Sequence, residues 1–272
     1  MPSPANATDY KHRLAASFDI RVNYDDEYTV SRATQLVQLA QLKDGDSVLD
    51  LATGTGIVAI LAARAVGAKG NVIGVDISPG MLDQAQKKIR AEGLQRIELI
   101  EADVEKLNFE AESFDAILCS SALMWLTDIP AILRNCNTWL KNGGLLAFSC
   151  YSESSFMIPL WVRACARFGI DLPNCNGPLG TQDRCRELLQ AAGFDKIKIR
   201  TEQLGSYLSR SDVECHWNGD SNWIDPRGNP LAGLSSERLK EIRAAYNSEI
   251  DAVTTDQGFW YEITMFLVLV RK

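Results

Sequence analysis

Residues 47–82, SVLDLATGTGIVAILAARAVGAKGNVIGVDISPGML, decide the fold of this chain. They begin with an apolar run at 48–51, interrupted only by Asp50, and continue into a turn of small residues at 52–56. An apolar run at helical spacing follows, and then a second β-branched run that ends at Asp76. This order of strand, glycine-rich turn, helix and strand predicts one βαβ unit, which is right-handed in a parallel sheet.

The turn and the acid after it predict a site for an adenosine cofactor. Gly54 and Gly56 let the backbone bend sharply, and they let a ligand approach more closely than a Cβ atom would permit. Asp76, at the tip of the second strand, can accept hydrogen bonds from two ribose hydroxyls. The same residues also match the dinucleotide fingerprint, G-x-G-x-x-A with an acid about 20 residues later, so the turn alone does not choose the cofactor.

Asp50, on the first strand, favours one cofactor over the other. A pyrophosphate would bring negative charge to the turn, where this carboxylate would repel it. S-adenosylmethionine brings a sulfonium and an ammonium group instead, and a nearby carboxylate attracts both. The sequence therefore favours S-adenosylmethionine, while a nicotinamide-dependent oxidoreductase built on the same βαβ unit stays open as an alternative.

Two motifs in this region resemble those of the class I S-adenosylmethionine-dependent methyltransferases. The run VLDLATGTG at 48–56 resembles their motif I, and DISPGML at 76–82 resembles their second-strand signature, D-x-S-x-x-M-L. Among these enzymes the chain resembles the small-molecule ubiquinone/menaquinone C-methyltransferase type (methyltransferase type 11). Ala52 stands where the commonest motif I has its first glycine, a replacement that is tolerable if the φ angle there is negative.

The resemblance also implies which residues hold the cofactor. Asp103 and Val104, just past the third strand, resemble motif II, in which an acid accepts the adenine amine and a backbone N–H serves a ring nitrogen. Met81 would pack on the adenine face, and the end of the fourth strand at Ser120 would lie where the methyl group is presented. The full set of implied cofactor residues is Asp50, Ala52, Thr53, Gly54, Gly56, Asp76, Ile77, Met81, Asp103, Val104 and Ser120.

Composition and charge narrow the range of partners. The chain has 272 residues, a formal net charge of −7 and a pI near 5.0, which argue against nucleic acid or an anionic membrane surface as the main partner. No D/N-P-P-Y/F motif, which would resemble amino-methyltransferases of DNA bases, follows the fourth strand. No apolar run is long enough for membrane insertion and the first residues lack a signal-peptide core, so we expect a cytoplasmic protein. A homo-oligomer stays open.

Seven cysteines are scattered through the chain without a CxxC pair, so neither a disulfide framework nor a metal site is expected. Buried thiols are the simplest interpretation. The alternative is thiol chemistry on a soft substrate such as arsenic. That chemistry would need a convergent cluster, for which Cys165, Cys175 and Cys185 are the candidates.

We therefore predict an α/β fold: a doubly wound, mostly parallel, seven-stranded Rossmann-like sheet whose last strand, 259–271, is antiparallel and lies toward the far edge. The chain is expected to form a single methyltransferase domain over 1–272. Within it, 1–43 is a helical cover, 44–204 and 258–272 form the cofactor-binding core, and 205–257 is an inserted lid or substrate region. The first helix should turn Leu14, Phe18 and Ile20 inward, and 141–144 should form a turn before the fifth strand.

The predicted function is transfer of the sulfonium methyl group to an O, N or C atom of a largely apolar small-molecule acceptor, of the kind found in secondary metabolism. His216 is the candidate general base because its ordinary pKa lies near neutrality, and Trp217 and Trp223 could wall the acceptor. Tyr24 and His12 are weaker catalytic candidates, and alignment without an enzyme base is a further alternative. A non-catalytic adenosine-binding subunit also stays open.

Overall fold

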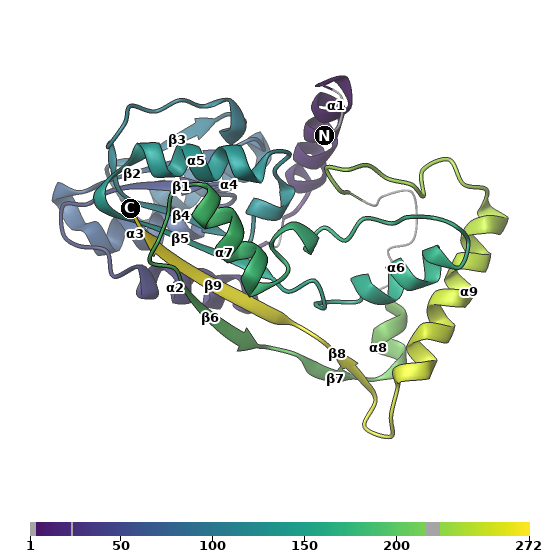
Figure 1. The fold of residues 1–272 in the computed structure, drawn as a ribbon. Helices are drawn as coiled ribbons and strands as arrows, with labels where there is room; N and C mark the ends of the chain where they lie inside the picture. Colours follow the sequence, from purple (N-terminus) through teal and green to yellow (C-terminus); the bar gives the residue numbers. More distant parts are fainter. Residues whose placement is uncertain (1–3, 23, 216–223) are drawn as a thin grey trace.

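The computed structural model describes residues 4–22, 24–215 and 224–272, and its centre is a seven-stranded sheet (Figure 1). The strand order is β3-β2-β1-β4-β5-β9-β6, and every pairing is parallel except those that β9 makes with β5 and β6. The strands are β1 (Ser47–Leu51), β2 (Asn71–Asp76), β3 (Ile97–Glu101), β4 (Phe114–Ser120), β5 (Leu140–Tyr151), β6 (Lys198–Gln203) and β9 (Thr264–Arg271). The predicted doubly wound, mostly parallel sheet with an antiparallel last strand is confirmed.

The last strand lies one place inward from the predicted edge. β9 pairs with β5 on one side and with β6 on the other, so β6 is the edge strand. Phe266, Leu267 and Val268 are all buried, although successive side chains of a strand point to opposite faces. An apolar run that is covered on both faces suits the interior of a sheet better than its edge.

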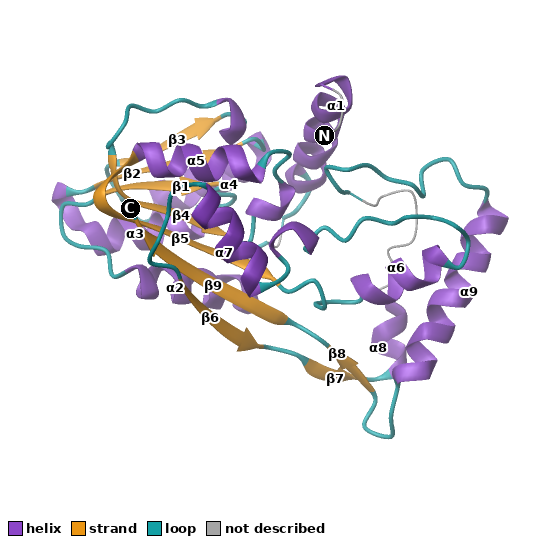
Figure 2. Ribbon diagram, in the orientation of Figure 1, coloured by secondary structure: helices purple, strands orange, loops and turns teal. Residues whose placement is uncertain are grey.

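Helices cover both faces of the sheet, as Figure 2 shows. On one face lie α2 and α3, and on the other lie α5 and α7, while α4 packs against β2 and β3. The α-helices of these layers are α1 (Pro4–Asp19), α2 (Glu27–Ala40), α3 (Ile57–Val66), α4 (Pro79–Ala91), α5 (Ile129–Trp139) and α7 (Gln182–Ala191). Short 3-10 helices are η1 (Gly67–Lys69), η2 (Val104–Lys106), η3 (Leu123–Trp125) and η4 (Gly177–Leu179).

The two cores of the sheet follow from the alternation of side chains along its central strands. In β1, Leu49 and Leu51 join the core beneath α5 and α7, whereas Val48 joins the core beneath α2 and α3. A strand whose side chains alternate between two covered faces has to be apolar almost throughout. Asp50 interrupts this pattern and is nevertheless buried, which marks it for a role other than packing.

The turn expected at 141–144 is instead an irregularity inside β5. The pairing of β4 with β5 shifts in register between Phe114, which faces Leu140, and Ala116, which faces Leu145. The extra residues on β5 include Gly143, at φ 79°. A glycine supplies this left-handed backbone at little cost, so the strand can accommodate the irregularity without ending.

The two segments inserted between the last strands share one hydrophobic core of their own. The first insertion lies between β5 and β6 and contributes α6 (Ile158–Ala166). The second lies between β6 and β9 and contributes α8 (Arg210–Cys215) and α9 (Ser236–Val253). Trp161 stacks on Tyr246, with ring centroids 4.4 Å apart. A two-stranded sheet of β7 (Ser206–Leu208) and β8 (Phe259–Tyr261) joins this cluster to β6 and β9, and Figure 1 shows it beyond the main sheet.

The cysteines described in the structure are buried thiols, as expected. Cys165 belongs to the core of the insertions, while Cys185 Sγ lies 3.9 Å from Cys150 Sγ beneath α7. Among the described residues there is no group of three or more metal-ligating His, Cys, Asp or Glu side chains. The cluster that arsenic chemistry would need is therefore not formed by Cys165, Cys175 and Cys185. In the same described part, no helix is long and apolar enough to cross a membrane.

We expect Gly56→Ala to destabilise the fold by roughly 2 kcal/mol or more in urea unfolding, because a Cβ atom there would lie 2.9 Å from Ala85 Cβ. Gly93→Ala is the matched control, since Gly93 also has a positive φ of 64° but no atom within 4 Å of an added Cβ. The control should lose only about 1 kcal/mol, from backbone strain alone. Equal losses in the two variants would show that close α3–α4 packing does not require Gly56.

Candidate active site

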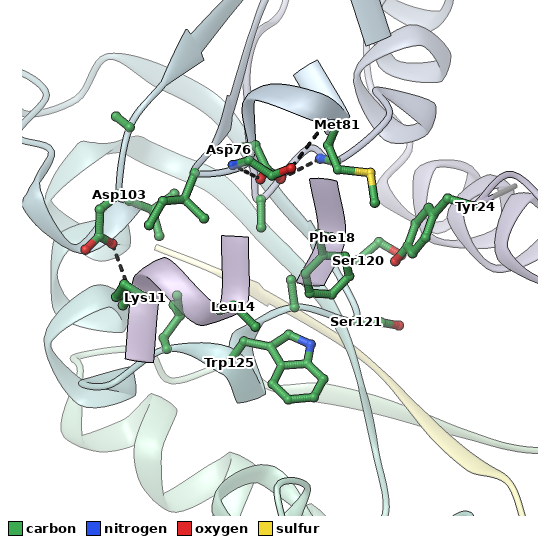
Figure 3. A pocket seen from close by; sticks show the side chains of 18 residues that line it. Lys11, Leu14, Phe18, Tyr24, Asp76, Met81, Asp103, Ser120, Ser121 and Trp125 are labelled. Atoms are coloured by element: carbon green, nitrogen blue, oxygen red, sulfur yellow. Dashed lines mark hydrogen bonds and ion pairs between the residues drawn. The ribbon is translucent and has the colours of Figure 1, made fainter. Parts of the chain in front are cut away.

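A pocket lies at the carboxyl ends of β1, β2 and β4, with α1 across it (Figure 3). Open α/β sheets bind ligands where neighbouring strands continue to opposite sides, and β1 and β4 meet here in that way. The predicted cofactor residues that line this pocket are Ala52, Gly54, Asp76, Ile77, Met81, Asp103, Val104 and Ser120. The structure therefore brings most of the predicted set together, while Asp50, Thr53 and Gly56 are buried without lining the pocket.

Backbone hydrogen bonds fix the glycine-rich turn after β1. Thr53 N donates to Val75 O at 2.8 Å, and Gly56 N donates to Thr53 O at 2.9 Å. Gly54, at φ 55°, borders the pocket, and a Cβ atom added there would meet no protein atom within 4 Å. Such a side chain would instead occupy space that is open to a ligand. This agrees with the expectation that glycine lets a ligand approach the backbone closely here.

Ala52 adopts a left-handed conformation with φ 53°, so the condition under which alanine would be tolerable here, a negative φ, is not met. For alanine this conformation costs about 1 kcal/mol more than for glycine. The chain has to make the same bend that glycine makes in the commonest motif I, because it must leave β1 and return over the pocket. Backbone strain of this kind gathers at functional sites.

Asp76 is held by backbone N–H groups from two elements. Its Oδ2 accepts from Gly54 N at 2.7 Å, and its Oδ1 accepts from Ser78 N at 2.9 Å. Burial raises the pKa of this carboxyl, while the hydrogen bonds from Ser78 and Gly54 oppose the rise. Together with the Ile77 N–H, three backbone donors thus engage this carboxylate, which still has acceptor capacity for a ribose hydroxyl.

Met81 lies in the first turn of α4, next to this acid. Ser78 caps the helix, because its Oγ accepts from Met81 N at 3.1 Å, and Pro79 follows in the first turn. Met81 is only 1 % exposed, yet it borders the pocket beside Asp76 (Figure 3). A polarisable thioether next to the acid that is predicted to bind ribose is well placed to pack on a flat aromatic base.

Helix α1 is fastened over the pocket at two points. At its carboxyl end, Asp19 Oδ1 accepts from Ser78 Oγ at 2.6 Å. Two turns earlier, Lys11 Nζ donates to Asp103 Oδ1 at 2.9 Å and also to the Glu105 carboxylate. Lys11 is 8 % exposed, so this ion pair is largely removed from water. The predicted helical cover is thus attached to two of the elements that form the pocket.

Lys11 and Asp19 are the residues near the site that the sequence analysis missed. Lys11, Leu14 and Phe18 all line the pocket, and they recur at the spacing of one helix face. A lysine in register with two apolar residues was therefore a readable signal. Ile20, which was predicted on that face, lies beyond the end of α1 and is 79 % exposed.

The end of β4 forms the second half of the pocket. Ser121 has φ 55°, and its N–H donates to Ser149 O at 3.1 Å and to Ser149 Oγ at 2.9 Å. Ser120, Ser121 and Trp125 line the pocket in consequence. Tyr10 of α1 supports this wall, since its hydroxyl donates to Trp125 O at 2.8 Å. Trp125 is therefore a wall of the pocket.

The candidate bases have different positions. Tyr24 lines the pocket, but burial raises the pKa of its phenol, so at neutral pH it is a hydrogen-bond donor and not a base. His12 is exposed on α1 and does not line the pocket. His216, together with Trp217 and Trp223, lies outside the described residues. Their roles in catalysis and in covering the acceptor stay predictions.

Asp50 is a buried acid directly behind the pocket wall. It is 1 % exposed, and its Oδ2 accepts from Thr53 Oγ1 at 2.6 Å. Its Oδ1 has no hydrogen-bond partner among the described residues. Burial raises the pKa of Asp50 to about 7, and the nearby charge of Asp76 contributes to the rise. A cationic ligand in the pocket would stabilise the ionised form of this carboxyl.

We expect Asp50→Asn to raise the melting temperature of the ligand-free protein more at pH 8 than at pH 5. The wild-type carboxyl has a folded pKa of about 7, above its unfolded value. Its contribution to stability is therefore complete below the unfolded pKa and is lost as the pH rises through 7. Asparagine has no such loss. Thermal melts across this range measure the difference.

Asp83→Asn is the control for that experiment, because Asp83 is exposed on α4 and its substitution should give no pH-dependent difference. If Asp50→Asn changed the melting temperature equally at both pH values, the raised pKa of Asp50 would be refuted.

Comparison with known proteins agrees with this geometry. A family model described as a methyltransferase domain matches residues 48–144, which span β1 to the first part of β5. The aklanonic acid methyltransferase DauC of Streptomyces sp. (strain C5) is 33% identical over 144 residues, which is 52% of this chain and 66% of that protein. The match thus spans just under two thirds of that relative.

Two further proteins extend the comparison. A demethylmenaquinone methyltransferase of Lactobacillus johnsonii is 40% identical over 182 residues, which is 61% of this chain and 75% of that protein. The solved structure of Haemonchus contortus phosphoethanolamine N-methyltransferase 2, in complex with S-adenosylhomocysteine, shares the fold with a TM-score of 0.57 at 17% identity, over 97% of this chain and 57% of that one. With its motifs and strand order, the chain therefore belongs to the S-adenosylmethionine-dependent methyltransferases of class I, whose cofactor is S-adenosyl-L-methionine.

Proposed function

We propose that this protein transfers the methyl group of S-adenosylmethionine to an O, N or C atom of a largely apolar small molecule. The observation that carries the proposal is that one pocket joins two kinds of wall. Gly54, Asp76 and Met81 form the cofactor wall, and Phe18 and Trp125 form an aromatic wall beside the end of β4. An open pocket at this place also argues against a non-catalytic adenosine-binding subunit.

The residues present fit the cofactor. The open space beside Gly54 would admit it, and the buried Asp50 carboxylate, whose Oδ1 has no hydrogen-bond partner among the described residues, would attract its cationic groups. Asp76 would hold the ribose, and Met81 would pack on the adenine. When bound, S-adenosylmethionine supplies an electrophilic methyl group, and the protein has to align the acceptor and exclude water. Phe18 and the rest of the α1 face supply the exclusion of water.

Several observations support a small-molecule acceptor. The printed names of two relatives refer to aklanonic acid and demethylmenaquinone. The aromatic wall of the pocket favours an acceptor with apolar surface. A role in secondary metabolism and a cytoplasmic location are part of this proposal and rest on the sequence alone.

We also propose that the inserted region, 205–257, governs the choice of acceptor within a single methyltransferase domain. None of the described residues of this region lines the pocket itself. It approaches the pocket through α1, where burial raises the pKa of Tyr10 and the charge of Asp225 raises it further. Asp225 is 2 % exposed and accepts hydrogen bonds from Arg227, so this loop is ordered by its own contacts next to the cover helix.

Asp76→Ala should weaken binding of S-adenosylhomocysteine by roughly 1.5–3 kcal/mol, because two charge-assisted hydrogen bonds to the ribose are lost. Isothermal calorimetry measures this, with a thermal melt to confirm that the variant is folded. Asp183→Ala, at an exposed position of α7, is the control and should bind normally. NAD should not bind the wild-type protein. Unchanged affinity in the Asp76 variant would remove the assignment of the adenosine site.

Lys11→Met should speed the dissociation of S-adenosylhomocysteine at least about fivefold, since it removes the charged contact that ties α1 to Asp103. Stopped-flow displacement by excess ligand gives the rate. Arg13→Met is the matched control, because Arg13 lies on the same helix but is half exposed and pairs only with Asp9 among the described residues. If both variants release the ligand at the wild-type rate, α1 does not retain the cofactor through this contact.

A further inference from the structure

A half-buried arginine next to the pocket makes no ion pair with a carboxylate of the described residues. Arg32 of α2 donates through Nη1 to the Tyr151 hydroxyl and through Nη2 to Thr29 Oγ1, the latter at 3.2 Å. Its Nε is buried and has no hydrogen-bond partner among the described residues, and no carboxylate of those residues forms an ion pair with it. A guanidinium with an unused buried N–H is expensive unless an anion completes it.

Aromatic rings surround this guanidinium. Its central carbon lies 3.5 Å from the ring centroid of Tyr28 and 5.6 Å from that of Tyr151. Phe156 packs on Tyr151, with ring centroids 4.8 Å apart, and Tyr261 packs on Phe156. The rings stabilise the cation from its faces, and of the hydroxyls on these rings only that of Tyr151 is seen to accept from an N–H group of Arg32 among the described residues.

The hollow in front of Arg32 adjoins the cofactor pocket. Its lining consists of Arg21, Tyr24, Asp26, Tyr28, Thr29 and Arg32. Tyr24 is shared with the cofactor pocket, so the two spaces meet at one side chain. On the opposite side, Tyr151 ends β5, the neighbour of β4, and burial raises the pKa of its phenol while Arg32 and Ser121 oppose the rise. Ser121 lines the cofactor pocket as well.

The charges around the hollow favour an anion. Two of its lining residues, Arg21 and Arg32, are cationic, and Asp26 is the single acid among them. Asp26 is exposed, and its Oδ1 accepts from Thr29 N at 2.7 Å as the N-cap of α2, so its carboxylate is already engaged elsewhere. The net charge of the lining is therefore positive at neutral pH.

We propose that Arg32 binds an anionic group of the methyl acceptor, and that the acceptor class is an aromatic or otherwise apolar acid bound as its carboxylate. This inference rests on the proposed methyltransferase function and names the substrate class of the same site. Arginine suits the task because its guanidinium carries five N–H donors, and the bonds to Tyr151 and Thr29 use only two of those on Nη1 and Nη2. The aromatic rings around it would contact the apolar body of such an acid.

The test compares acids with their neutral amides on the wild-type protein saturated with S-adenosylhomocysteine. The probes are benzoate against benzamide and 2-naphthoate against 2-naphthamide, followed by ligand-observed NMR titration at pH 7.5. In at least one pair the carboxylate should bind tenfold or more tightly than the amide, which is about 1.4 kcal/mol. If neither pair shows this preference, including the case in which the carboxylates do not bind, the proposal is overturned.

Variants then assign the preference to the residue. Arg32→Gln should abolish it, Arg32→Lys should retain only part of it, and binding of S-adenosylhomocysteine should change less than twofold in both. Arg64→Gln is the matched control, since Arg64 on α3 pairs with Glu92 at 2.5 Å, and its loss changes the net charge equally. If Arg64→Gln reduced the preference for carboxylates as much as Arg32→Gln does, the preference would be a general effect of net charge, and its assignment to Arg32 would be overturned.

The two levels of the proposal fail in different ways. If the wild-type protein does not bind S-adenosylhomocysteine, the proposed function fails. If it binds S-adenosylhomocysteine but does not prefer carboxylates, only the acceptor class fails. Should Arg32→Gln not fold, the comparison of acids with amides on the wild-type protein still decides the outcome.

Discussion

The double use of the Asp76 carboxylate is the constraint on which the site depends. One oxygen fixes the turn after β1 through Gly54, and the other fixes the start of α4 through Ser78. Ser78 in turn bonds to Asp19, so the position of the cover helix α1 derives from the same acid. A single carboxylate at the tip of β2 thereby sets the floor, one side and the cover of the pocket. Ligand contacts would be added to an arrangement that already exists.

This arrangement costs stability. Burial raises the pKa of Asp50 and of Asp76, which means that each ionised carboxylate is less stable here than in water. Ala52 adds left-handed strain, and Arg32 adds a buried donor without a partner among the described residues. All four features are centred on or beside one pocket, while the hydrophobic cores on both faces of the sheet offset their cost. Such concentrated local cost is typical of a site shaped for ligands rather than for folding.

Much of the fold was predictable because its signals are local. Periods of two and 3.6 residues, together with the glycine turn around Gly54, indicated the βαβ unit and the order of elements. The resemblance to the class I methyltransferases implied most of the other cofactor residues that line the pocket. Contacts between distant segments were not predictable in the same way. Lys11 meets Asp103 across 92 residues of chain, and no local pattern links them. The positive φ of Ala52 was not predictable either, because the bend of the turn, rather than residue preference, sets the backbone there.

The shared core of the two insertions has a consequence for recombination between relatives. Trp161 comes from the first insertion and Tyr246 from the second, and they stack within one hydrophobic cluster. Segments 151–178 and 205–258 therefore form a pair that has to be inherited together. A crossover that brought in only one of them would leave half of a core without its complement, even though the sheet and the turn at Gly54 would be intact. In this chain, two separate stretches of sequence would therefore have to be exchanged together in a functional recombinant.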